Sequence, residues 1–271
     1  MSHIRLVSRL SLYSLTHLSP STFFNWCHKR NFVPASPLAD LTRPRVPQGL
    51  KAYFTPEQFQ RLLQAIEEDL LLKGALKGAA AQHGLADLPA IVRLAVETGL
   101  RRGELLHLRW LDVDLRAGLV HVRAYHDRRH GIQFKPKDTD ARAVPLSPTA
   151  RALLRQRSIA RTDENDSALV FPSSRTWKVR DGRQLYRTFK KYVRLAGLPD
   201  ELHFHSLRHT FASWLASGGT PIVTIQRWMG HSKIEQTMVY ADLLPSALAW
   251  QPSPFHEASL LTPVLESVSE P

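Results

Sequence analysis

The sequence predicts a mainly α-helical protein that also contains a small antiparallel β-sheet. Three observations lead to this fold class. Apolar residues recur at helical spacing behind helix-start signals, the pattern shortens to strand-like segments between residues 119 and 146, and helical spacing then returns. No run of about 18 uncharged apolar residues occurs, so no membrane span is indicated.

The first helical signal is Phe23–Arg30, which is typical of the end of an amphipathic helix. Prolines then interrupt the pattern, and Arg43–Gly49 is the best candidate for a linker. A new helix is expected at Thr55-Pro56-Glu57, which supplies an N-cap, a first-turn proline and an early acid. A second domain is therefore expected to begin near Ala52.

The middle of the chain changes from helix to strand. Leu88–Val96 is predicted to be a helix that ends at Gly99, which places Arg101 at a turn between two helices. Three short segments with turn residues between them are then expected to form one small sheet: Leu119–Val122, Gly131–Phe134 and Arg142–Leu146. Lys135 and Lys137 would lie near a hairpin of this sheet.

Helices are expected again after the sheet. Ser147-Pro148 is a helix start, Tyr186–Leu195 has helical spacing, and a helix beginning at His205 would stop at Gly218-Gly219. Thr220-Pro221 is expected to open the next helix, with Thr220 as N-cap and Gly230 as its end.

The last predicted helix carries Tyr240. Ser232 and Glu235 have the spacing of a capping box at its start. Its inward face is expected to consist of Ile234, Thr237, Met238 and Ala241, which directs Tyr240 away from the core.

Charge and cysteine content narrow the function. The formal net charge of +12 favours a phosphate-rich partner, although a merely basic soluble surface is the plainer explanation. The excess lies before residue 241, because residues 241–271 contain four acids and no Lys or Arg. Cys27 is the sole cysteine, which excludes an intramolecular disulfide and a thiolate metal cluster within one chain.

Three motifs resemble those of the tyrosine recombinase family, which includes phage integrases and bacterial chromosome-resolving recombinases. They are TGLRRGEL at Thr98–Leu105, HSLRHTFAS at His205–Ser213, and MGHS at Met229–Ser232 running on to Tyr240. The resemblance covers roughly Ala52–Leu244, and the order and spacing of the motifs are more restrictive than any one of them.

The resemblance implies a site of six residues. Arg101 and Arg208 would hold a DNA phosphate, His205 would assist proton movement around the nucleophile, and His231 would donate to a non-bridging phosphate oxygen. Tyr240 would attack the phosphate and form a 3′-phosphotyrosine link without ATP, a metal or another cofactor. Lys137 would be the general acid for the leaving 5′ oxygen, with Lys135 as the second choice.

The residue types suit this chemistry. A guanidinium stays protonated and can bind two phosphate oxygens with its planar set of donors. A phenol has a pKa of about 10, so it needs cations and a base nearby to become a nucleophile. Taken singly, each of these residues is more often structural. His205 and His209 also have the i, i+4 spacing of a metal pair, but no third ligand is apparent.

The resemblance also implies a domain plan and partners. Residues 1–45 would be a partial, truncated helical core-binding region, 46–51 a linker, 52–250 the catalytic integrase domain, and 251–271 a C-terminal tail. The expected partners are double-stranded DNA and three further copies, in a homo-tetramer held by tail exchange, with no membrane. A cytoplasmic recombinase of bacterial or phage origin, serving integration or excision of a mobile element, would fit.

Several alternatives stay open. The chain could be a non-catalytic DNA-binding remnant of an integrase, or a type IB topoisomerase-like enzyme that relaxes DNA without a partner site. The acid-poor start, which carries Arg and Ser, also resembles an organelle transit peptide.

Overall fold

A computed structural model describes residues 20–40, 51–77, 86–127, 132–136, 141–161, 165–173, 176 and 178–245. The chain divides into two compact units, Met1–Gln48 and Gly49–Pro271. The predicted tail 251–271 and most of the predicted linker lie outside the described residues.

The smaller unit contains one described helix, α1 (Pro20–Lys29), at the predicted place. Its Cys27 side chain is buried. Trp26 packs against Phe32, with a ring-centroid distance of 5.6 Å, and the guanidinium of Arg30 lies over the Trp26 ring. These contacts fold the chain after the helix back onto it.

The larger unit is mostly helical, as the sequence predicts. Its described α-helices are α2 (Pro56–Lys77), α4 (Leu88–Thr98), α5 (Arg102–Leu106), α6 (Pro148–Ile159), α7 (Gly182–Leu195), α8 (Ser206–Ser217), α9 (Ile222–Met229) and α10 (Glu235–Met238). Two short 3₁₀ turns, η3 (Trp110–Asp112) and η4 (Ala241–Leu243), complete the helical elements.

Most predicted helix ends agree with the structure because capping chemistry is local. Thr55 Oγ1 accepts a hydrogen bond from the Gln58 N–H, and Ser147 Oγ accepts one from the Ala150 N–H. Gly99 ends α4 in the left-handed conformation, at φ 61°.

The predicted starts of the last two helices were wrong. Helix α9 begins one residue late, at Ile222, because Pro221 has extended backbone and serves as the N-cap. The N-cap of α10 is Ile234, which makes no side-chain capping bond, so Ser232 is not the cap.

Within the described residues the strands form two sheets, where the sequence predicted one. In the first, β2 (Leu119–Val122) lies between β1 (Val113–Asp114) and β5 (Arg142–Pro145), all antiparallel. In the second, β3 (Tyr125–Asp127) pairs with β4 (Ile132–Phe134). The short β3 was not predicted, and by pairing with β4 it separates that strand from the main sheet.

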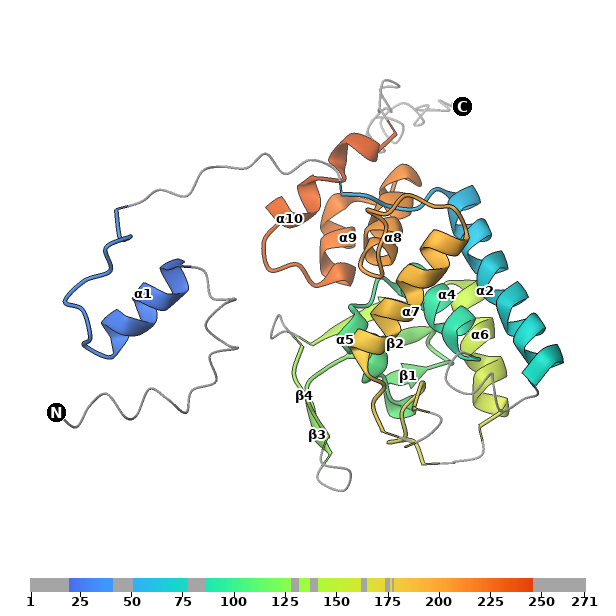
Figure 1. Ribbon diagram of the computed structural model, residues 1–271. Coiled ribbons are helices and arrows are strands. Elements are labelled where there is room, and N and C mark those ends of the chain that lie inside the picture. Colours follow the sequence, from blue (N-terminus) through green and yellow to red (C-terminus); the bar gives the residue numbers. More distant parts are fainter. Residues whose placement is uncertain are drawn as a thin grey trace, which may run out of the picture. The chain divides into compact units, whose positions relative to one another are not determined.

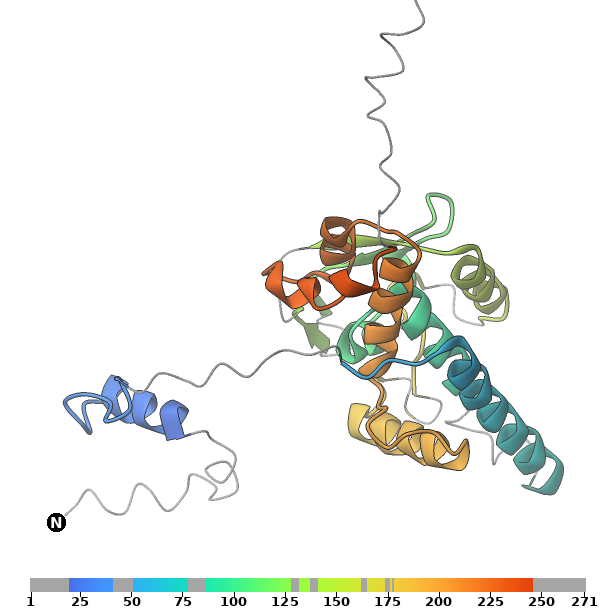
Figure 2. The same ribbon diagram turned by 90° about the horizontal axis from the view of Figure 1, so that it is seen from above.

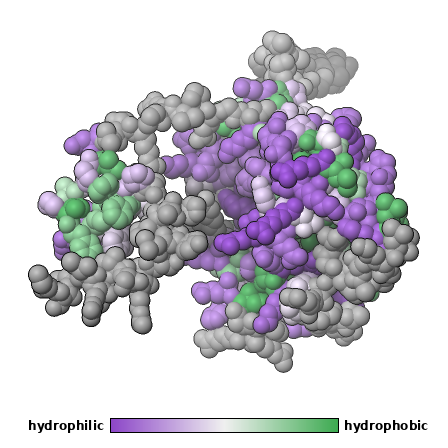
Figure 3. Space-filling model, viewed as in Figure 1, coloured by the Kyte–Doolittle hydropathy of each residue, from purple (hydrophilic) through white to green (hydrophobic). Residues whose placement is uncertain are grey.

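Helices α4 and α8 pack side by side within the larger unit, with α9 beside α8 (Figures 1 and 2). Helices α2 and α6 both pack on α4, and η4 packs on α8. The face shown in Figure 3 is largely hydrophilic over this unit, and the buried residues of the unit are mostly apolar. Among the described helices, none combines the length and apolarity that crossing a bilayer requires.

The close contact of α4 and α8 depends on Gly99. A Cβ atom there would lie 2.3 Å from the Phe211 ring, and the φ of +61° disfavours other residues. We expect Gly99→Ala to lower the free energy of unfolding by about 2–5 kcal/mol, from backbone strain and overpacking together. Urea unfolding measures this change.

Gly103 provides the matched control, because a Cβ atom there meets nothing within 4 Å and the residue lies inside α5. Gly103→Ala is expected to leave stability unchanged or raise it by about 0.5–1 kcal/mol, the helix preference of Ala over Gly. Equal losses at the two positions would contradict the packing argument.

Candidate active site

Three arginines converge on the C-terminal end of α9. Arg142 Nε donates to the Trp228 carbonyl at 2.9 Å, Arg208 Nη2 to the Met229 carbonyl at 2.5 Å, and Arg101 Nη2 to the Gly230 carbonyl at 3.1 Å. Carbonyls at a helix end lack intrahelical partners and carry the negative end of the helix dipole. This end of α9 therefore binds and orients three cations.

Arg208 is the most buried of the three, with 2% of its surface exposed. Its Nη1 donates to the Gly99 carbonyl at 2.6 Å, so the guanidinium is fixed between the ends of α4 and α9. Burial, followed by repulsion from Arg101, lowers the pKa of Arg208 to about 9. The group is still a cation at neutral pH.

Arg101 lies at the predicted turn, as the N-cap of α5. A buried carboxylate, Glu104, holds it: Arg101 donates to Glu104 from its backbone N–H at 2.8 Å and from Nη1 at 3.0 Å. Part of the Arg101 side chain, 18%, is exposed. Arg101 is thus positioned by the protein and still accessible to a ligand.

Glu104 is also paired with Arg142 through both carboxylate oxygens, at 3.0 Å and 2.6 Å. Burial by itself raises the pKa of Glu104, but the hydrogen bonds and charge of Arg142 outweigh burial and the net pKa is lowered. The carboxylate is therefore ionised at neutral pH, and it offsets part of the positive charge of the arginines.

His231 follows Gly230 and is half-buried. Its Nδ1 lies 2.9 Å from Thr237 Oγ1, and Gln226 Nε2 donates to its backbone carbonyl at 3.1 Å. Gly230 has a left-handed φ of 64°, and a Cβ atom there would lie 2.8 Å from Arg142 Cδ. The turn that carries His231 therefore packs directly on the arginine cluster.

The predicted orientation of Tyr240 was wrong. Tyr240 follows the end of α10 and caps η4, and only 1% of its surface is exposed. Met238, expected on the inward face, is 51% exposed. Helical α10 ends at Met238, so helical periodicity does not extend to residue 240. In this conformation the residues that cover Tyr240 must move before its hydroxyl can reach a ligand on the surface.

Tyr240 Oη contacts His209, whose Nδ1 lies 2.6 Å away and whose side chain is buried. Burial raises the pKa of Tyr240 to about 12, although the charge of Arg208 acts in the opposite direction. Burial, then the charges of His205 and Lys51, lowers the pKa of His209 to about 3. At neutral pH both groups are therefore uncharged.

His205 is the N-cap of α8, and its ring centroid is 4.8 Å from that of His209. Its surface is exposed, yet the protein atoms around the imidazole and the charge of Arg208 lower its pKa to about 4. The three-residue spacing of His205 and Arg208 would place both side chains on one face of a helix. In the structure Arg208 points into the protein, whereas His205 lies at the surface with its ring next to that of the buried His209.

Lys137, the predicted general acid, lies outside the described residues. Lys135 follows β4 and is exposed. The other five predicted residues, Arg101, His205, Arg208, His231 and Tyr240, lie around α8 and the end of α9. Within the described ranges, no three His, Cys, Asp or Glu side chains are grouped as metal ligands would be.

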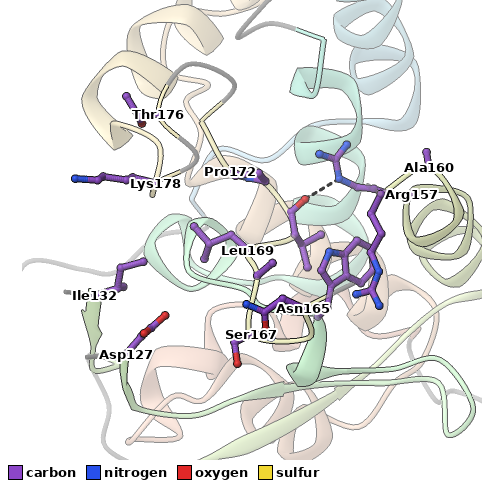
Figure 4. Close-up of a pocket in the computed structure, with 14 residues that line it drawn as sticks. Asp127, Ile132, Arg157, Ala160, Asn165, Ser167, Leu169, Pro172, Thr176 and Lys178 are labelled. Carbon is purple, nitrogen blue, oxygen red and sulfur yellow. Dashed lines mark hydrogen bonds between the residues drawn. The ribbon is translucent and has the colours of Figure 1, made fainter. Parts of the chain in front are cut away.

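A pocket of about 500 Å³ lies elsewhere, between the β3–β4 pair, the end of α6 and residues 165–172, with Thr176 and Lys178 (Figure 4). Asp127 and Ile132 line it from the hairpin, and Arg157, which donates to the Val170 carbonyl, lines it from α6. None of the described predicted site residues lines this pocket. The volume of this pocket therefore does not indicate where the candidate active site lies.

Sequence reasoning did not assign a role to three residues of the cluster: Glu104, Arg142 and His209. Glu104 is three residues after Arg101, so an acid at the third helical position was a usable signal. Arg142 is 38 residues from Glu104 and gave no such signal. His209 was considered only as a metal ligand with His205, since nothing local indicates that it contacts Tyr240.

Residues 52–246 match the phage integrase family. Among curated proteins, the chain is 27% identical to tyrosine recombinase XerC of Thermodesulfovibrio yellowstonii, over 81% of this chain and 67% of that protein. It is 30% identical to XerC of Xanthomonas axonopodis pv. citri, over 82% of this chain and 64% of that protein. The match thus spans about two thirds of these relatives.

Two solved structures have the same fold as the chain. XerH site-specific recombinase, bound to a palindromic difH substrate in a post-cleavage complex, has a TM-score of 0.59 and 21% identity, covering 95% of this chain and 71% of XerH. The Tn1549 transposon integrase, in complex with a circular intermediate DNA, has a TM-score of 0.57 and 22% identity, covering 82% and 71%.

Proposed function

Since the chain belongs to the phage integrase family, we propose that it is a site-specific DNA recombinase that cleaves and rejoins DNA through a 3′-phosphotyrosine link at Tyr240. The observation that carries this proposal is the convergence of Arg101, Arg208 and His231 on the end of α9, with Tyr240 in contact with His209, the residue next to Arg208 in α8. Such a cluster combines an anion site with a nucleophile.

Arg101 and Arg208 bind the two non-bridging oxygens of the scissile phosphate. Arg208 is held by two carbonyls and Arg101 by Glu104 and a third carbonyl, so both guanidinium groups are already oriented before a phosphate binds. Fixed cations stabilise the charge that grows on the phosphate during attack, and one preorganised donor is commonly worth about 10²–10³ in rate. His231, at the adjacent turn, supplies a further donor to a non-bridging oxygen.

The reaction is a phosphoryl transfer. Tyr240 Oη bonds to phosphorus, the bond from phosphorus to the 5′ oxygen breaks, and a 5′-hydroxyl leaves with a proton from the general acid, Lys137. The phenolic proton of Tyr240 passes to a base in the site as Oη attacks, and His205, exposed beside the arginines, assists this transfer. A 5′-hydroxyl from a partner strand then attacks the phosphotyrosine, which reforms a phosphodiester and releases Tyr240. The phosphodiester bond energy is conserved in the link, so the proposal includes no nucleotide cofactor.

The partner in this proposal is double-stranded DNA, which is supported by the Tn1549 integrase in complex with a circular intermediate DNA and by XerH bound to a palindromic difH substrate. The net charge of +12 suits a polyanion. The biological role we propose is integration or excision of a mobile element by four copies that exchange their tails, 251–271. The rival functions are a DNA-binding remnant that no longer cleaves and a topoisomerase that relaxes DNA at any sequence.

The test begins with duplexes that the full chain selects from a random pool. From one such duplex we prepare a series of substrates, each nicked close to a different possible cleavage position. Cleavage beside the nick releases a short DNA fragment that diffuses away, so the covalent intermediate accumulates. We expect a protein–DNA adduct that survives denaturant, has a free 5′-hydroxyl end, and maps to the peptide that contains Tyr240. Binding without any adduct would indicate the remnant, and relaxation of plasmids that lack the selected sequence would indicate the topoisomerase.

A further inference from the structure

His209 is a buried histidine, 6% exposed, for which the mechanism above has no role. It directly follows Arg208 in α8, so one helix carries both the most buried phosphate ligand and the residue that contacts the nucleophile. Tyr240, its partner, enters from the segment after α10, 31 residues later. The contact of 2.6 Å between Nδ1 and Oη is therefore made by tertiary packing.

The direction of this hydrogen bond follows from protonation. The buried phenol keeps its proton, and the buried imidazole is neutral because the charges of His203, His205, Lys51 and Arg208 and the loss of solvent all oppose a second proton. We therefore assign Tyr240 Oη–H as the donor and Nδ1 as the acceptor, with the imidazole hydrogen on Nε2. A neutral imidazole whose lone pair faces the proton to be removed has the geometry of a general base.

We propose that His209 is a further catalytic residue, which holds the hydroxyl of Tyr240 and accepts its proton as Oη attacks the DNA phosphate. This inference rests on the recombinase function proposed above. In this proposal His209 is the residue that takes the proton from the nucleophile, Tyr240. His205, the histidine that the motif resemblance favours for proton movement around the nucleophile, lies at the surface above His209, 4.8 Å between ring centroids.

The step balances in both directions. As the bond from Oη to phosphorus forms and the bond to the 5′ oxygen breaks, the phenolic proton passes to His209 Nδ1 and the leaving oxygen takes a proton from the general acid. During rejoining, the incoming 5′-hydroxyl attacks phosphorus and gives up its proton to that acid's conjugate base. The departing Tyr240 oxygen recovers its proton from His209.

DNA itself promotes this transfer. The phosphodiester brings a negative charge to Arg101 and Arg208, and Arg208 is one of the cations that oppose an imidazolium at His209. Neutralising those cations makes a positive charge on His209 less unfavourable. Tyr240 is 1% exposed, so its hydroxyl must also be uncovered before it can attack the phosphate.

Two substitutions of His209 distinguish its two proposed roles, which are to hold the Tyr240 hydroxyl by a hydrogen bond and to accept its proton. In His209→Asn, the amide oxygen occupies about the place of Nδ1 and can accept the hydrogen bond, but it does not take up a proton near neutral pH. His209→Leu removes both properties. Thr210→Val is the matched control, because it removes a buried hydrogen-bonding group from the next position of α8, where Thr210 bonds to Ser206 and Phe54.

The measurement is the single-turnover rate of adduct formation by the full chain on the selected nicked duplex, with DNA saturating. We expect both His209 variants to be slower by about 10²–10⁴-fold at pH 7, the usual contribution of a general base. The rate of His209→Asn should also rise about tenfold per pH unit, since hydroxide then removes the phenolic proton. Thr210→Val should bind and cleave like the wild type.

A second substrate distinguishes loss of the general base, which acts on Tyr240, from loss of the general acid, which acts on the leaving 5′ oxygen. Replacing the bridging 5′ oxygen with sulfur gives a leaving group that departs without a proton, which compensates for loss of the general acid but not for loss of the base. The His209 variants are expected to stay slow on this substrate. Recovery of their rates would place His209 on the leaving-group side and overturn the proposal.

Other outcomes are equally decisive. A His209→Asn rate within tenfold of the wild type would show that His209 only positions the hydroxyl, and a His209→Leu protein faster than the wild type would show that the contact merely restrains Tyr240. Either result overturns the inference alone. A wild-type protein that forms no adduct overturns the recombinase function and this inference with it. Circular dichroism and DNA binding confirm that each variant is folded before its rate is compared.

Discussion

The Tyr240→Phe protein is expected to form no covalent complex with DNA, while it binds the selected duplex as tightly as the wild type. Phenylalanine preserves the buried ring, which is 1% exposed, and removes only the oxygen that attacks. No neighbouring side chain can replace that oxygen in a 3′-phosphotyrosine link. The measurement is denaturing gel electrophoresis of the protein with labelled nicked duplex, alongside a binding assay.

Loss of the hydroxyl also leaves His209 Nδ1 without its donor, at a cost of about 1–3 kcal/mol in unfolding free energy. Tyr192→Phe is the matched control, since Tyr192 is also 1% exposed and donates to Asp69 at 2.5 Å. The control is expected to lose comparable stability and to form the adduct normally. An adduct formed by Tyr240→Phe would remove Tyr240 as the nucleophile, and an adduct lost from both proteins would mean that lost stability explains the effect of Tyr240→Phe.

The second large effect is expected at Glu104, which is 4% exposed and accepts hydrogen bonds from Arg101 and Arg142. Glu104→Gln keeps the size of the side chain but leaves two largely buried guanidinium groups without their counter-charge. Breaking a buried ion pair in this way typically costs about 3–5 kcal/mol. Urea unfolding at neutral pH measures the loss.

Adduct formation by Glu104→Gln is expected to fall as well, because Glu104 positions Arg101 for the phosphate. Glu67→Gln is the control: Glu67 pairs with Arg93 at 2.8 Å, but their side chains are 46% and 40% exposed. An exposed pair is worth about 0–1 kcal/mol. Similar losses in the two variants would mean that the Glu104 pair contributes no more than a surface pair.

The stability that Glu104 contributes to the folded protein should decrease as the pH falls through the acid range. Its pKa is lower in the folded protein than the ordinary value of 4.5, so the unfolded chain binds a proton first as the pH falls. The contribution is therefore complete above about pH 4.5 and is lost as the pH falls through the lower folded-state pKa. The difference between wild type and Glu104→Gln should shrink over that acid range and stay constant above it.

Local sequence signals predicted the helices well and the strands less well. Thr55 and Ser147 cap helices through their own side chains, and Gly99 and Gly230 end helices in left-handed conformations, so these boundaries depend on a few adjacent residues. Strand pairing joins residues that are distant in sequence. The pairing of β4 with β3, which separates β4 from the main sheet, therefore had no local signal.

The sequence by itself determined the fold class, most of the helix ends and the motif residues, because capping chemistry and motif spacing are properties of contiguous residues. Only the tertiary structure decided that Tyr240 faces inward to His209 and that Glu104 pairs with Arg142. Residue 240 lies beyond α10, where helical periodicity no longer predicts direction, and Arg142 reaches Glu104 from another element. Such contacts depend on how α5, α8, α9 and β5 pack, which no single stretch of sequence encodes.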